Sequence, residues 1–167
     1  LKYLPAKKDY FIDIPAGTLH AINRDVVTYN ISRNADLTYR LYDYERLDPK
    51  TQKERQLHVD KVLDNVRIPD DSKGFVWVQP VKRSGCEVTE YWDEPGLYTL
   101  SRVRVKDHGT LKLDRFAFLT IVEGEGRVNE VKVRKGETVL IPAHTETVVL
   151  TGELDLFVAS YRNKENV

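Results

Sequence analysis

The 167-residue sequence has no methionine, a single cysteine and no long run of apolar residues. The lone cysteine, Cys86, excludes an internal disulfide and fits a reducing cytoplasm. Since no apolar run approaches the roughly 20 residues that cross a bilayer, and no signal peptide opens the chain, we expect a soluble protein without a membrane partner. Basic and acidic residues number 26 each, so no net field is available to recruit nucleic acid.

The sequence also lacks a starting methionine, because it opens at Leu1. We therefore expect it to be the C-terminal portion of a longer protein. Its length is sufficient for one large domain or two small ones, each with a buried core.

Short strand-like segments separated by turn residues run through most of the sequence. The early part predicts strands at 10–14, 26–31 and 38–44. The later part predicts strands at 97–105, 116–122, 128–133, 138–141 and 154–160, with turns at Gly124-Glu125-Gly126 and Lys135-Gly136-Glu137. Many short strands spaced by turns are typical of all-β proteins, and here they predict jelly-roll barrels.

One helix is expected near 57–66, where apolar residues recur at helical spacing. Residues 67–74 include a proline, two aspartates and a glycine, and this composition predicts a linker. Residues 1–66 and 75–167 would then be two barrel units, of which the first lacks its opening strands.

The two expected units share a short segment. Ile14-Pro15-Ala16-Gly17-Thr18-Leu19-His20 recurs in degraded form as Ile141-Pro142-Ala143-His144-Thr145-Glu146-Thr147. The Pro-x-Gly-x-x-His spacing at 15–20 resembles the second conserved motif of the cupin superfamily, in which a tight turn directs an imidazole towards a metal. The second copy has Thr147 in place of His20. We therefore expect metal chemistry in the first unit alone.

Three segments of the first unit occur in a recognisable order. They are Pro15-Ala16-Gly17-Thr18-Leu19-His20-Ala21, Thr38-Tyr39-Arg40-Leu41-Tyr42-Asp43-Tyr44-Glu45-Arg46 and Arg55-Gln56-Leu57-His58. Together they resemble the C-terminal part of type I mannose-6-phosphate isomerases, which are zinc-dependent cupin enzymes. Residues 121–126 are similar to the second cupin lobe of that family.

The resemblance implies a role for two residues. His20 matches the last ligand of one Zn²⁺ ion, whose other ligands, a Gln-x-His pair and a Glu, would lie upstream of Leu1. Arg40 matches the catalytic, substrate-binding arginine beside the sugar phosphate. The alternatives are a hydrogen-bonded core histidine at position 20 and a surface ion pair of Arg40 with Asp36 or Glu45.

The implied reaction interconverts mannose 6-phosphate and fructose 6-phosphate through a cis-enediol. The chain alone, with one metal ligand, would be inactive. The alternative is a non-catalytic cupin that binds a sugar or sugar phosphate for regulation, because residues 29–34 replace the family's Glu-x-Gln-Gln. The catalytic base and the oligomeric state stay open.

The other three histidines have weaker prospects as ligands. His58 is expected to pack on the helix. His108, expected in a polar turn, and His144 have no neighbouring ligands in the sequence. The second unit is therefore expected to be a stabilising jelly roll without a metal.

Overall fold

The computed structural model of the chain describes residues 2–33, 35, 37–70, 72–94 and 96–161. The chain divides into two units, Leu1–Val76 and Trp77–Val167. The boundary lies just beyond the segment 67–74 that the sequence marks as a linker. Each unit is described by itself below.

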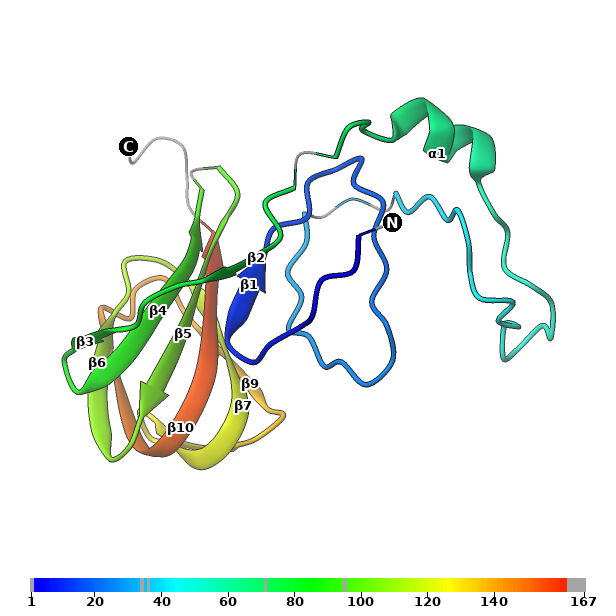
Figure 1. Cartoon of the computed structure of the whole chain (residues 1–167). Helices are drawn as coiled ribbons and strands as arrows, with labels where there is room; N and C mark the ends of the chain where they lie inside the picture. The colour runs from blue at the N-terminus through cyan, green and yellow to red at the C-terminus, as the bar shows by residue number, and fades with distance from the viewer. Residues whose placement is uncertain (1, 34, 36, 71, 95, 162–167) are drawn as a thin grey trace. The chain divides into compact units, whose positions relative to one another are not determined.

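The second unit is built from antiparallel strands. These are β3 (Val81–Arg83), β4 (Cys86–Asp93), β5 (Tyr98–Val105), β6 (His108–Lys112), β7 (Ala117–Val128), β8 (Val131–Arg134), β9 (Thr138–Ile141) and β10 (Thr147–Tyr161). Their order in the sheet is β3-β4-β5-β10-β7-β8, with β6 paired to β10 and β9 paired to β7. Figure 1 shows the long β10 between β5 and β7.

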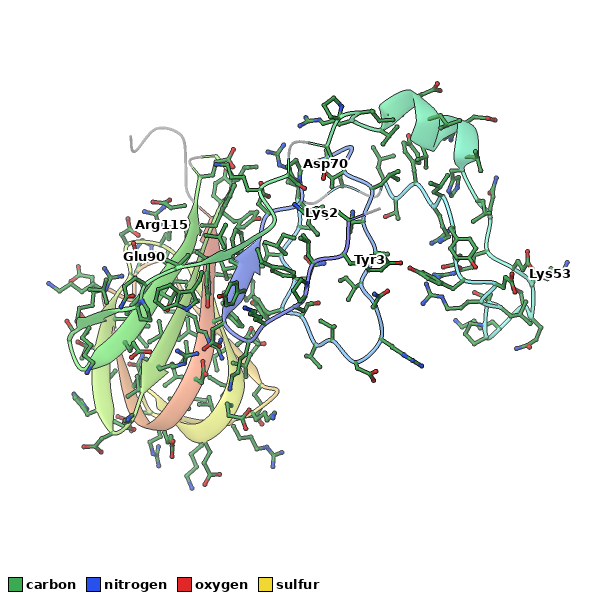
Figure 2. All side chains as sticks on the ribbon, viewed as in Figure 1. Lys2, Tyr3, Lys53, Asp70, Glu90 and Arg115 are labelled. Atoms are coloured by element: carbon green, nitrogen blue, oxygen red, sulfur yellow. The ribbon has the colours of Figure 1, made fainter. Side chains whose placement is uncertain are left out.

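The core of this unit comes from alternate residues of the central strands, as expected when side chains point to opposite faces in turn. Leu156 of β10 lies opposite Val103 of β5 and Ile121 of β7, and at most 1% of each of these residues is exposed. On the solvent-facing side Glu90 of β4, labelled in Figure 2, accepts a 2.5 Å hydrogen bond from Arg83. The all-β prediction is confirmed.

The predicted turn at Gly124-Glu125-Gly126 is wrong. These residues lie inside β7, opposite residues 152–154 of β10, and the chain reverses instead at Asn129 and Glu130. The glycines are needed because the two backbones approach closely: a Cβ at Gly126 would lie 2.0 Å from the Thr151 carbonyl oxygen. The predicted strand at 128–133 is interrupted by this reversal, whereas the turn at Lys135 and Gly136 is confirmed.

The first unit has little regular structure among its described residues. β1 (Tyr10–Ile12) pairs with β2 (Phe75–Trp77), and α1 (Val59–Asn65) confirms the predicted helix. This helix is too short to cross a membrane, and no longer one occurs in the described chain. The strands predicted at 26–31 and 38–44 are not formed in the residues described, where neither segment pairs with another strand in a sheet.

Candidate functional site

The Ile-Pro-Ala turn of the first unit is fixed by its own backbone and by helix α1. The Thr18 amide donates a 3.1 Å hydrogen bond to the Pro15 carbonyl, and Gly17 has a φ of +88°, a value that favours glycine. The Arg67 amide donates to the Gly17 carbonyl at 2.9 Å, and a Cβ at Gly17 would lie 2.8 Å from the Asn65 carbonyl oxygen. The predicted turn is confirmed, and glycine allows it to lie against the end of α1.

His20 follows this turn on an exposed, irregular segment rather than on the expected returning strand. Its Nδ1 lies 2.9 Å from the Thr18 carbonyl oxygen. Because a carbonyl only accepts, Nδ1 is the donor in this contact, and in a neutral imidazole Nε2 then has a lone pair for another partner. Metal-binding histidines often use this arrangement.

The described residues do not complete a metal site around His20. No group of three or more His, Cys, Asp or Glu side chains placed to bind a metal ion occurs among them. A catalytic zinc needs about three protein ligands. His20 therefore suits the role of a single ligand, and the part of the chain that the structure describes does not supply the others.

Arg40 is tied to the segment before α1 through its backbone and its side chain. The His58 amide donates to the Arg40 carbonyl at 2.7 Å, and the Arg40 amide donates to His58 Nδ1 at 3.2 Å. The Arg40 guanidinium donates from Nη1 to the Gln56 carbonyl at 3.3 Å. The position of its backbone is thus set by two hydrogen bonds to one residue.

The Arg40 side chain also faces Asp43, whose carboxylate is the centre of a cluster of arginines. Arg40 Nε lies 3.7 Å from Asp43 Oδ1, and 24% of the Arg40 side chain is exposed. Arg55 donates to both Asp43 oxygens, at 2.6 and 2.5 Å, and Arg46 Nη2 donates to Oδ1 at 2.8 Å. Asp43 is buried. We call Asp43, Arg40, Arg46 and Arg55 the arginine cluster.

The charges of the arginine cluster do not cancel. Three guanidinium groups surround one carboxylate, so these four side chains carry a net positive charge, which the nearby Asp48 carboxylate reduces through its interaction with Arg55. The hydrogen bonds from Arg55, followed by those from Arg46, keep the pKa of Asp43 below its ordinary value, although desolvation acts in the opposite direction. Asp43 is therefore ionised at neutral pH.

The partner of Arg40 in the structure differs from the alternative partners that the sequence suggested. Arg40 pairs with Asp43 rather than with Glu45, and Asp36 lies outside the described residues. No hydrogen bond or ion pair joins His20 to Arg40 in the described part of the chain. Sequence reasoning gave no role to Asp43 or Arg55, although both belong to the motif segments around Arg40.

Comparison with known proteins supports the family resemblance. Residues 89–161, from within β4 to the end of β10, match the family model described as mannose-6-phosphate isomerase, cupin domain. A mannose-6-phosphate isomerase from Streptococcus mutans is 26% identical over 172 residues, which cover 98% of this chain and 52% of that protein. Mannose-6-phosphate isomerase ManA of Bacillus subtilis is 27% identical over 166 residues, which cover 95% of this chain and 51% of that protein. The resemblance to mannose-6-phosphate isomerases is confirmed.

A solved structure extends this similarity to the fold. The mannose 6-phosphate isomerase of Bacillus subtilis aligns with a TM-score of 0.66 at 23% identity, over 76% of this chain and 41% of that chain. At this identity the likeness shows the fold alone, and together with the match to the family's cupin domain it confirms the predicted all-β cupin fold. The chain spans about half the length of the curated relatives it matches.

The match to the mannose-6-phosphate isomerase cupin domain includes the second Ile-Pro-Ala copy. Here the Thr145 amide donates to the Pro142 carbonyl at 3.1 Å, which repeats the hydrogen bond between Thr18 and Pro15. Thr147 then opens β10 and lies opposite Lys112 of β6. The turn is therefore retained in both copies, while the second copy has Thr147 at the position of His20.

The histidines of the second unit have different surroundings. His108 opens β6 rather than lying in a turn. His144 lines an open cavity of about 510 Å³ together with Lys112, Leu113, Asp114, Ala143 and Glu146. Neither histidine belongs to a metal-binding group of side chains among the described residues.

Proposed function

We propose that the full-length protein that contains this chain is a cytoplasmic mannose-6-phosphate isomerase, which interconverts mannose 6-phosphate and fructose 6-phosphate. The observation that carries the proposal is the anchored Arg40, which lies in the segment of residues 38–46 that resembles the family. Relatives that bear the isomerase name align with nearly the whole chain. The substrate class would be a small phosphorylated sugar.

His20 would provide one ligand of a Zn²⁺ ion in this enzyme. Its exposed imidazole and the hydrogen bond from Nδ1 to the Thr18 carbonyl support this role, because Nε2 stays available. A bound zinc would polarise the substrate oxygens at C1 and C2. The remaining ligands are expected outside these residues, so the 167-residue chain alone should be inactive.

Arg40 would bind the substrate and stabilise negative charge. As the proton moves between C1 and C2 through a cis-enediol, charge develops on a substrate oxygen, and a guanidinium stays protonated and donates hydrogen bonds to it. The excess positive charge of the arginine cluster supports the binding of an anionic sugar phosphate. No described residue is assigned as the base.

The two units would then have different tasks. Residues 1–66 would belong to the metal-bearing cupin lobe, residues 67–74 would be the linker, and residues 75–167 would form a second cupin lobe without a metal. The paired turns support this division, since the turn after Pro142 is kept while Thr147 replaces the ligand. The second lobe would stabilise the protein.

A non-catalytic cupin that binds a sugar phosphate is the second candidate. The replacement of Glu-x-Gln-Gln at 29–34 favours it. The two candidates are distinguished by incubating the zinc-loaded full-length protein with mannose 6-phosphate and measuring both binding and fructose 6-phosphate formation. Turnover supports the isomerase, binding without turnover supports the regulatory protein, and the absence of both contradicts the two candidates.

A further inference from the structure

We propose that Asp43 is a positioning residue for Arg40: its buried carboxylate directs the Arg40 guanidinium towards the substrate, while Arg46 and Arg55 fix the carboxylate in place. This inference rests on the proposed function, since it assumes that Arg40 acts on a sugar phosphate. It assigns to Asp43 a task that needs no contact with the substrate.

The contacts of Asp43 are those of a fixed anchor. Arg55 binds both carboxylate oxygens in the bidentate geometry that guanidinium and carboxylate groups prefer, at 2.6 and 2.5 Å. Arg46 adds a hydrogen bond to Oδ1 at 2.8 Å and another from Nε to the Asp43 carbonyl at 3.2 Å. The carboxylate therefore has little freedom to rotate. Its Oδ1 is the oxygen that faces Arg40 Nε.

The backbone and the guanidinium of Arg40 depend on different residues. His58 makes both backbone hydrogen bonds of Arg40. The Arg40 side chain donates a hydrogen bond to the Gln56 carbonyl and forms an ion pair with the Asp43 carboxylate. Loss of the Asp43 charge should thus leave the Arg40 backbone in place and release its guanidinium, which two neighbouring cations would then repel. A misplacement of a catalytic group by about 1 Å can cost on the order of 100-fold in rate.

The test is a double-mutant cycle on the zinc-loaded full-length protein, with mannose 6-phosphate as substrate. Asp43→Asn keeps the size of the side chain and removes its charge. We expect kcat to fall at least about 10-fold in D43N. In an Arg40→Ala background the same change should alter kcat less than about 2-fold, because the group that Asp43 directs is absent. A structural role for Asp43 would lower activity by the same factor in both backgrounds, and that result would overturn the inference.

Asp48→Asn is the matched control. Asp48 is a carboxylate of the same loop, but it accepts hydrogen bonds from Lys50 and Thr51, and its charge acts on Arg55 rather than on Arg40. We expect kcat of D48N within about 2-fold of the unmodified protein. If D43N does not fold, the double variant D43N/R55Q, which removes one charge of each sign, replaces it in the double-mutant cycle. Equal loss in D43N and D48N would also overturn the inference.

The outcomes separate this inference from the proposed function. An unmodified protein that forms no fructose 6-phosphate contradicts both. An active unmodified protein with an equally active D43N contradicts the positioning role alone. Both the proposed function and the positioning role are supported if the unmodified protein is active, D43N is slow, and D43N has little further effect in the R40A background.

Discussion

Arg55 donates hydrogen bonds to both carboxylate oxygens of Asp43, and these bonds are the largest cause of the lowered pKa of that carboxyl group. A carboxyl group with a depressed pKa in the folded state stabilises the fold at any pH above its unfolded pKa, about 3.9. The stabilisation is lost as the pH falls through the folded value.

The first prediction concerns this pH dependence. The difference in free energy of unfolding between the unmodified protein and Asp43→Asn should be constant above about pH 5 and should shrink below about pH 4. Urea unfolding at a series of pH values measures it. A difference that persists unchanged below pH 3 would mean that the Asp43 charge does not stabilise the fold.

The second prediction concerns Arg40 itself. Arg40→Ala in the full-length protein should lower turnover at least about 100-fold, because a stabilising charge beside the reacting oxygens is removed. Arg24→Ala is the control, since Arg24 is almost fully exposed and its ion pair with Asp25 is on the surface. Steady-state formation of fructose 6-phosphate gives both values. Unchanged turnover in R40A would reject the role of Arg40.

The third prediction concerns the metal. His20→Ala should remove zinc from the purified full-length protein, because a catalytic zinc with one ligand fewer is bound far more weakly. His144→Ala, in the equivalent turn of the second unit, should retain the metal. Metal analysis after dialysis reports the ratio of zinc to protein, and a full complement in H20A would refute the assignment.

The fourth prediction concerns the closely spaced strands β7 and β10. Gly126→Ala should destabilise the protein by about 2–3 kcal/mol, because the new methyl group meets the Thr151 carbonyl oxygen and the backbones must separate. Gly136→Ala is the control: open space surrounds Gly136, so it should cost about 1 kcal/mol for its positive φ alone. Denaturant unfolding compares the two, and equal losses would contradict the close approach.

The fifth prediction concerns Cys86, which is 2% exposed and whose pKa is raised chiefly by burial. The thiolate is the reactive form, so the folded protein should react slowly with a thiol reagent at pH 8. Denaturant should bring full reactivity. The measurement is the rate of labelling with and without denaturant, and rapid labelling of the folded protein would contradict the burial of Cys86.

The sequence predicted the second unit better than the first. Strand 138–141 and the turn at Gly136 were correct because alternating side chains and turn residues act locally. Gly124 and Gly126 were wrongly predicted to form a turn. In sequence, a glycine required by the close approach of a neighbouring strand cannot be told from a glycine required by a turn. In the first unit, 26–31 has the composition of a strand, but strand formation depends on a partner that local sequence does not reveal.

The candidate site was predicted in part for a similar reason. The family resemblance proposes His20 and Arg40 as site residues, and both assignments stay predictions. The buried Asp43 was missed, because a carboxylate three residues from an arginine is common on protein surfaces and its burial depends on Arg55, which is twelve residues further along the chain. The contact between Gly17 and the end of α1 likewise joins segments that are far apart in sequence.

The fifteen-residue β10 pairs with β5, β6 and β7, so most of the second sheet is linked through one strand. During synthesis, β5 and β6 emerge from the ribosome before β10. Until β10 emerges, the edges of β5 and β6 that pair with it stay unpaired. Unpaired edges are prone to join other chains. Folding of this unit should therefore be completed only after β10 has emerged, and shortening β10 should favour aggregation.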